Sequence, residues 1–129
     1  MSAASELPYQ CSPHHLISLI EMLCDKLDCA VEDLGYELDF RKRDAEDMMR
    51  YWPMYASWKG KCYKVHSRTL SEHPADTMQC STHKVTIDVD YKENYGVELK
   101  HPELPCVVSD HELLLPVLYP LEVVYVDLI

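Results

Sequence analysis

Apolar residues recur at helical spacing near the start of the chain. Ser12 and Pro13 are residue types that favour an N-cap and a first helical position. The apolar stripe that follows comprises Leu16, Ile17, Ile20, Leu23, Cys24 and Leu27. This spacing predicts an amphipathic helix that packs one face against a core.

A shorter second helix is predicted between Asp44 and Pro53. Asp44 can cap it, and Pro53 stops it. Its apolar positions are Ala45, Met48, Met49 and Trp52. Residues 29–43 have no decisive period, so the sequence assigns them no element.

The residues after this second helix follow a β pattern. Strands are predicted around Trp58, Cys62 and residues 63–65, with Gly60 as a turn or bulge. Residues 71–81 are polar and predict a loop or an irregular hairpin tip.

The remaining chain combines one short helix with several short strands. Residues 88–95 have helical spacing, and Gly96 is placed to end that helix. Short strands are expected at residues 84–87, 106–108, 113–115 and 122–126, and residues 97–99 are expected to be extended. The order predicts an α+β fold, with helices first and then a small strand-rich body that carries one inserted helix.

Length and composition suit one domain. The chain has 129 residues, of which 47% are hydrophobic. We expect a polar leader over residues 1–12 and a domain over residues 13–129. No apolar run approaches the roughly 20 residues of a membrane span, and the first residues lack the pattern of a signal peptide. We therefore expect a cytoplasmic location, with the nucleus as the alternative, and no membrane partner.

Catalytic and metal-binding patterns are missing from the sequence. There is no Gly-x-Ser-x-Gly motif, and the three glycines form no phosphate-binding loop. The seven histidines lack metal-ligand spacing, and the six cysteines form no Cys-x-x-Cys pair. We expect reduced thiols, no metal and no cofactor, and a binding module rather than an enzyme.

Charged and aromatic residues are unevenly distributed. The net charge is −10, yet residues 53–71 contain no acid and four bases, Lys59, Lys61, Lys64 and Arg68. Three aromatic residues interleave with these bases: Tyr55, Trp58 and Tyr63. Basic and aromatic side chains together are typical of single-stranded nucleic-acid sites. The alternative is an ordinary solvated strand with half-buried tyrosines.

Two motifs resemble the second half of a PAZ domain, the module of Argonaute, Piwi and Dicer proteins. The first is an aromatic-rich short helix that ends at Tyr95 and is followed by Pro102-Glu103-Leu104-Pro105-Cys106. The second is Tyr119-Pro120-Leu121-Glu122-Val123, which matches the family's Leu-Pro-Leu-Glu-Val strand. Upstream, Tyr63-Lys64-Val65 resembles its Tyr-Arg-Val strand, so the resemblance covers most of residues 13–127.

This resemblance implies both a fold and an activity. The fold is a small OB- or SH3-like β-barrel with N-terminal helices and an inserted β-hairpin plus short helix. The activity is recognition of the 3′ end of single-stranded small RNA, as in RNA-silencing proteins. Carried over by position, the phosphate ligands are Tyr63, Tyr95 and Lys61, and the pocket wall includes Tyr119. Other residues expected to line the site are Lys59, Trp58, Tyr55 and, in a shifted alignment, Tyr91.

Some positions depart from the family pattern. Asp90 stands where a second pocket tyrosine is usual, and a carboxylate that faces RNA phosphate would be repulsive. Tyr55 replaces a histidine, and the stacking phenylalanine aligns only loosely, on Met78. The alternative function is therefore a PAZ-like domain with a degenerate pocket, serving as a protein-interaction or scaffold module. The expected partners are single-stranded or 3′-overhang RNA in the first case and proteins of a silencing complex in the second. In the second case, Asp90→Tyr would improve RNA binding.

Overall fold

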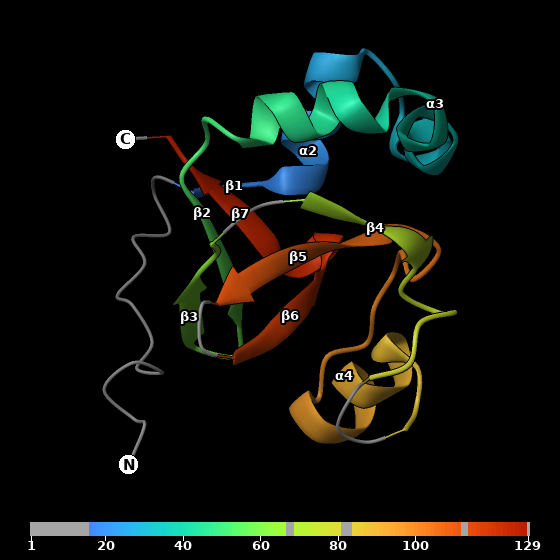
Figure 1. Cartoon of the computed structure of the whole chain (residues 1–129), viewed down its shortest axis with the longest axis vertical. Coiled ribbons are helices and arrows are strands. Elements are labelled where there is room, and N and C mark those ends of the chain that lie inside the picture. Colours follow the sequence, from blue (N-terminus) through green and yellow to red (C-terminus); the bar gives the residue numbers. More distant parts are fainter. Residues whose placement is uncertain (1–15, 67–68, 81–83, 112–113, 129) are drawn as a thin grey trace.

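Two antiparallel sheets form the body of the protein (Figure 1). The computed structural model describes residues 16–66, 69–80, 84–111 and 114–128. The first sheet has the order β1-β7-β2-β3, with β1 (Leu16–Ser18), β7 (Val124–Asp127), β2 (Met54–Trp58) and β3 (Lys61–Lys64). The second has the order β4-β5-β6, with β4 (Thr69–Pro74), β5 (Pro105–His111) and β6 (Leu114–Pro120). A 3-10 turn, η1 (Leu121–Val123), leads from β6 into β7.

These sheets and three helices confirm the predicted mixture of helices and strands, and two of the helices, α2 and α3, precede most strands. The expected closed barrel is not confirmed. Within the described ranges, no strand pairing joins the two sheets. A side-chain hydrogen bond does connect them, because the backbone N–H of His66 donates to Ser109 Oγ at 2.8 Å.

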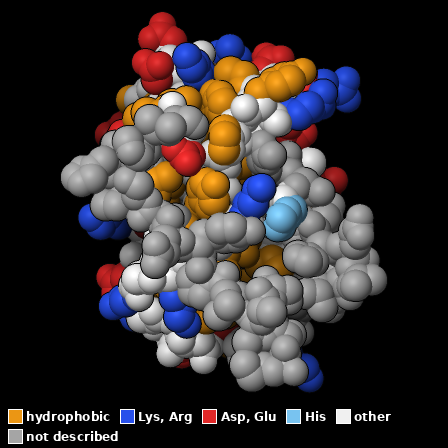
Figure 2. Space-filling view, turned by 90° about the vertical axis from the view of Figure 1, so that its left-hand side faces the viewer, with side chains coloured by type: hydrophobic (Ala, Val, Ile, Leu, Met, Phe, Trp, Pro, Cys, Tyr) orange, Lys and Arg blue, Asp and Glu red, His pale blue; other side chains and the backbone are white. Residues whose placement is uncertain are grey.

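Two helices cover one end of the sheets, at the top of Figure 1. They are α2 (Leu19–Leu27) and α3 (Val31–Met49). Each buries an apolar face, which comprises Leu19, Ile20, Leu23 and Leu27 in α2 and Leu34, Leu38, Ala45 and Met49 in α3. These side chains join the inward-facing residues of β2 and β7 in one core. The face in Figure 2 shows hydrophobic side chains among charged ones at the height of this helical layer.

The first helix begins later than its apolar stripe predicts. Leu16–Ser18 form a strand, in which Leu16 pairs with Asp127 and Ser18 with Tyr125. The edge of β7 offers backbone hydrogen bonds to this segment, and buried backbone groups need such partners. The predicted N-cap at Ser12 lies outside the described residues.

The second helix begins much earlier than predicted. It starts at Val31, so Asp44 lies inside α3 instead of capping a new helix. The backbone of Arg41 departs from helical geometry, with φ −119° and ψ 28°. The apolar face is interrupted by many charged residues and by Gly35, which hid the period of this helix in the sequence.

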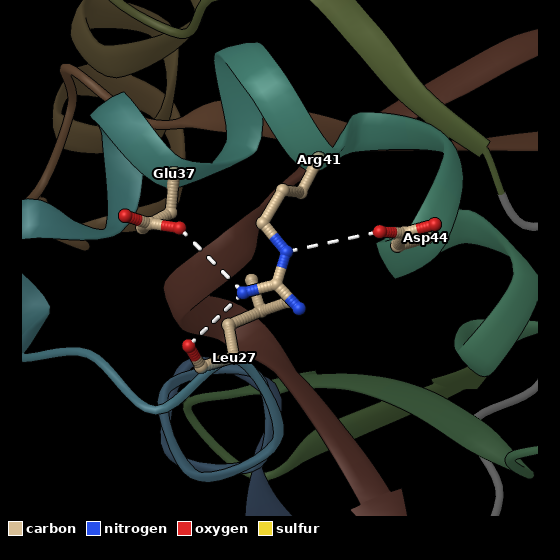
Figure 3. A network of polar contacts seen from close by, with 4 residues as sticks. All are labelled: Leu27, Glu37, Arg41 and Asp44. Carbon is tan, nitrogen blue, oxygen red and sulfur yellow. Dashed lines mark hydrogen bonds and ion pairs between the residues drawn. The ribbon is translucent and has the colours of Figure 1, made fainter.

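Arg41 holds the helical layer together at this kink (Figure 3). Its Nη1 donates a hydrogen bond to the Leu27 carbonyl at the end of α2, at 3.2 Å. Its guanidinium also lies 3.6 Å from the Glu37 carboxylate and 3.7 Å from that of Asp44. Arg41, the first of three consecutive basic residues at positions 41–43, therefore has a structural role.

The hairpin and the short helix predicted after Pro53 are confirmed. Lys59 and Gly60 form the turn between β2 and β3, with φ of 48° and 80°. Two successive positive φ angles are typical of the type I′ turn that suits a two-residue hairpin loop. The helix α4 (Ile87–Tyr95) ends at Gly96, whose φ of 68° is the left-handed conformation expected of a C-cap glycine.

Several strand predictions are wrong in detail. The polar segment expected to be a loop from residue 71 begins with the end of β4, because that segment pairs with β5. The strand expected at 84–87 is reduced to an isolated bridge between Gln79 and Thr86, and Ile87 already belongs to α4. The strand expected at 122–126 divides between η1 and β7, and residues 97–99, expected to be extended, belong to no strand or helix. The strand at 106–108 is confirmed within β5, and the described residues 114–115 of the strand expected at 113–115 belong to β6.

Of the five cysteines that the structure describes, four follow the prediction of reduced thiols and one does not. Cys24, Cys29, Cys80 and Cys106 are free thiols. Cys62 is disulfide-bonded, against that prediction. Within the described ranges, no helix combines the length and apolar character needed to cross a membrane.

Candidate nucleic-acid interface

Trp58, at the end of β2, is the centre of a cluster of aromatic rings. Its ring centroid lies 5.5 Å from those of Tyr63 and Tyr91, 5.6 Å from that of Tyr95 and 6.2 Å from that of Tyr119. The rings of Tyr91 and Tyr95 lie 4.9 Å apart, one helical turn from each other on α4. We call these five residues the aromatic cluster. It joins the β2–β3 hairpin, α4 and β6, and so it lies where the inserted helix meets the sheets.

Exposure differs between the members of the aromatic cluster. Tyr91 is 4% exposed and Tyr119 8% exposed, so these two rings form a buried floor. Tyr95 is 36% exposed, and Trp58 and Tyr63 are half-buried. An incoming ring or phosphate can therefore reach Tyr95, Tyr63 and Trp58, while Tyr91 and Tyr119 support them from below.

The hydroxyls of Tyr91 and Tyr95 remain protonated at neutral pH. Burial raises the pKa of Tyr91 well above 10.0, and the neighbouring Tyr119 and Tyr95 raise it further. Burial also raises the pKa of Tyr95, with the Asp90 carboxylate as the next cause. The partly exposed Tyr95 hydroxyl is thus available as a hydrogen-bond donor to an anionic ligand.

Two lysines stand at the edge of the aromatic cluster. Lys61 is exposed and pairs across the hairpin with Trp58, and directly paired residues share one face of a sheet. The Lys59 Cε and Nζ atoms both lie 3.5 Å from the point that a Cβ on Gly96 would occupy. The Lys59 ammonium therefore reaches across to the C-terminal end of α4, where the helix dipole favours a positive charge.

The structure does not bring every predicted site residue to this cluster. Tyr55 pairs with Lys64 and Tyr125, and the alternation along β2 puts it on the face opposite Trp58. The basic residues of the acid-free segment 53–71 are therefore divided between the two faces of the hairpin. Arg68 lies outside the described residues. Met78, the loosely aligned stacking position, is half-buried against the core instead of lying at the surface.

Asp90 does not face solvent, contrary to the sequence interpretation. Its residue is 3% exposed, and its Oδ1 accepts a hydrogen bond of 2.8 Å from Asn94 Nδ2. The sequence places Asp90 at helical spacing from Asn94, which was the available signal for this pairing. Burial therefore keeps Asp90 from contacting a ligand directly, but its carboxylate still acts on the Tyr95 hydroxyl, whose pKa it helps to raise, so it disfavours a phosphate there.

Glu122 is a positioning residue that the sequence reasoning missed. Its two carboxylate oxygens accept hydrogen bonds from the backbone N–H groups of Lys100 and His101, at 2.9 and 2.7 Å. These bonds fix the segment that leaves α4 and so help to hold Tyr95 against Trp58. The sequence did contain a sign of this role, because Glu122 is the single acid in the otherwise apolar and aromatic Tyr119–Val123 motif.

Comparison with solved structures identifies the arrangement of these elements. A structure of the Drosophila Argonaute PAZ domain in complex with 3′-end 2′-O-methylated RNA matches with a TM-score of 0.67 and 23% identity, over 87% of this chain and 98% of that one. The chain has a PAZ-like fold. A structure on 3′-end recognition of nucleic acids by the Drosophila Argonaute 2 PAZ domain matches with a TM-score of 0.60 and 22% identity, over 87% and 94% of the two chains. Another structure of the Drosophila Argonaute 2 PAZ domain gives 0.63 and 23%, over 86% and 98%.

The PAZ-like fold confirms the resemblance drawn from the two sequence motifs. By sequence, no family model matches the chain, and no characterised protein does so either. The similarity is therefore carried by the arrangement of the elements. Among the residues that the structure describes, no three His, Cys, Asp or Glu side chains come together as a possible metal site.

Proposed function

We propose that this PAZ-like domain binds the 3′ end of single-stranded RNA. The observation that carries the proposal is the aromatic cluster around Trp58, with Lys59 and Lys61 at its edge. Single-stranded RNA sites combine aromatic rings that stack on bases with basic side chains that follow the phosphates. The PAZ domains of similar fold, in complex with RNA or described in 3′-end recognition, support the same function.

Each side chain has a distinct role in this proposal. Tyr95 and Tyr63 donate hydroxyl hydrogen bonds to the last phosphates, and Lys61 neutralises one of them. Trp58 stacks on a terminal base. Lys59 contributes a second positive charge from the hairpin turn. Tyr91 and Tyr119 act from beneath, because both are buried and hold the accessible rings in place.

The acids are unevenly distributed around this site, since the β2–β3 hairpin carries none, whereas α4, which supplies Tyr91 and Tyr95, carries Asp88, Asp90 and Glu93. Ten of the 22 acidic residues lie between residues 19 and 49, in and around the two helices of the helical layer. Residues 53–71, which supply Trp58, Tyr63 and both site lysines, contain none. Local charge decides the approach of a phosphate, since exposed charges beyond about 10 Å are largely screened at 0.1 M salt.

Other parts of the proposal follow from the same function. The domain recognises RNA without a chemical step, it extends over residues 13–129, and it works inside the cell in a silencing complex. Its two sheets together take the place of the small barrel expected from the resemblance. The alternative is a scaffold with a degenerate pocket, which the net charge of −10 and the Asp90 carboxylate favour, although burial keeps Asp90 from contacting a ligand directly.

Binding is tested by fluorescence anisotropy with a 5′-labelled single-stranded RNA. A free 3′ end is expected to bind more tightly than a blunt duplex of the same sequence. Two phosphate contacts predict that log K falls with log salt with a slope of about −1.4, and Lys61→Gln should reduce the slope by about 0.7. Tyr95→Ala should weaken binding by about 1–3 kcal/mol.

Two matched controls lie far from the aromatic cluster. Lys26→Gln removes an exposed charge on α2, and Tyr51→Ala removes a tyrosine that is 79% exposed. Both should leave RNA binding unchanged. The proposal is overturned if no binding is detected at low salt, or if the controls weaken binding as much as Lys61→Gln and Tyr95→Ala do.

A further inference from the structure

A second candidate site lies between α3 and β4, which run next to each other in Figure 1. The two elements enclose a groove with a volume of about 310 Å³. Its α3 wall consists of Gly35, Leu38, Asp39 and Lys42, and its other wall consists of residues 70–74 with Glu103 and Pro105. None of these residues belongs to the aromatic cluster, so the groove is separate from the RNA site.

The groove has an apolar floor and an acidic rim. Leu38 and Leu70 are 3% and 4% exposed and form the floor. Asp39, Glu72 and Glu103 are exposed at the rim, where the one lysine is the half-buried Lys42. A ligand that alternates apolar and basic side chains fits both surfaces at once. An extended chain presents such alternation, because successive side chains point to opposite sides.

The backbone of β4 also suits an extended ligand. Among the described strands, β4 pairs with β5 alone, so it is the edge of its sheet. At the start of β4, the Leu70 N–H donates a 2.8 Å hydrogen bond to Glu46 Oε2 of α3. This bond fixes the start of β4 against α3, and the following residues 71–74 line the groove. An edge strand of this kind can accept a further strand through backbone hydrogen bonds.

The outer surface of α3 adds a feature that favours cations. Tyr36 and Phe40 are 65% and 72% exposed, and their ring centroids lie 4.8 Å apart. Two large rings exposed side by side are a common mark of an interaction surface, and ring faces attract Lys and Arg. Their neighbours in sequence, Gly35 and Asp39, line the groove.

The surrounding charge selects the chemistry of the partner. Residues 19–49 carry ten acidic and four basic side chains, which opposes a nucleic acid and attracts a cationic segment. We propose that the groove between α3 and β4 binds an extended segment of a partner protein in which Lys or Arg alternates with apolar residues. This site is independent of the proposed RNA site, so either can fail without the other.

The test uses a fluorescein-labelled peptide of three Val-Arg pairs. Its affinity is measured by anisotropy, and its position is mapped by amide chemical shifts of the ¹⁵N-labelled protein. Shifts are expected in residues 35–42 and 70–74. A peptide with the same residues in blocks, three Val and then three Arg, should bind at least several-fold more weakly because it lacks the alternation. The same alternating peptide with Glu in place of Arg should not bind.

Two charge-matched variants separate the groove from general acidity. Asp39→Lys with Glu72→Lys reverses two exposed rim charges and should weaken binding about tenfold. Glu21→Lys with Asp25→Lys makes the same change in net charge on α2 and should have little effect. Tyr36→Ala with Phe40→Ala, which removes the two exposed rings beside the groove, should also weaken binding. RNA binding should be unchanged in all three.

Several results would overturn the assignment. One is an alternating peptide that does not bind, or that binds as the block peptide does. Another is an equal loss of binding in the groove and α2 charge variants, which would indicate attraction to general acidity. A third is groove resonances that shift with protein concentration alone, which would identify a second copy of the chain as the occupant.

Discussion

Trp58 is expected to stabilise the junction between the hairpin and α4, so Trp58→Ala should lower the free energy of unfolding by about 3 kcal/mol. Trp58 has four ring contacts, at 5.5, 5.5, 5.6 and 6.2 Å. An aromatic pair contributes about 0.5–1.5 kcal/mol beyond burial, which gives about 2–6 kcal/mol for four. The lower half of this range applies, because Trp58 is half-buried and Tyr91 and Tyr95 keep their mutual contact at 4.9 Å.

The assay is urea denaturation followed by far-UV circular dichroism, with an unchanged m-value as the sign of a simple loss of stability. Trp58→Phe should retain about half of the stabilisation, since a smaller ring preserves some of the contacts. The control is Tyr51→Ala, which removes a ring that is 79% exposed and should change stability by no more than about 0.5 kcal/mol. A loss below about 1 kcal/mol for Trp58→Ala, or one equal to that of the control, would refute the central role of this ring.

Three further predictions concern backbone, burial and pH. Gly96→Ala should lower the free energy of unfolding by about 1–2 kcal/mol, because φ is 68° at this position. Gly35→Ala should leave it unchanged or raise it by up to about 1 kcal/mol, since the new Cβ would meet only Leu104, at 3.5 Å. Thermal denaturation of the two variants compares these effects. Asp90→Tyr should lower the free energy of unfolding by about 1–3 kcal/mol, because the buried position of Asp90 has no room for a ring. The same variant should fail to improve RNA binding. A stable Asp90→Tyr variant with improved RNA binding would contradict this prediction. Burial raises the pKa of Cys106 from 9.0 to about 12, so the folded state retains a proton that the unfolded state loses. Stability should therefore be constant below about pH 9 and fall above it, and denaturation curves at pH 7 and pH 10 should show a smaller drop for Cys106→Ala.

The sequence by itself determined the elements that depend on local chemistry. The turn at Gly60 and the end of α4 at Gly96 were predicted because both positions need a positive φ, which glycine adopts at no steric cost. The motifs at Pro102–Cys106 and Tyr119–Val123 indicated the PAZ-like fold in another way, through their resemblance to the sequence of that family.

Only the tertiary structure decided which distant residues meet and which face each one takes. Leu16–Ser18 became a strand because the edge of β7 was available, although their own pattern favoured a helix. Tyr55 and Trp58 both belong to β2, which pairs with β3 and β7, and because side chains alternate along a strand, these two residues lie on opposite faces of the sheet.

The candidate site follows the same rule. Trp58 meets Tyr91 and Tyr119 only because α4 and β6 fold back onto the hairpin, and the burial of Asp90 depends on that packing. Helix spacing and turn chemistry act over a few residues, whereas the free energy of burying these rings depends on surfaces supplied by the rest of the chain. The sequence therefore supplied the residue types of an RNA-binding site, and tertiary packing selected which of them form it.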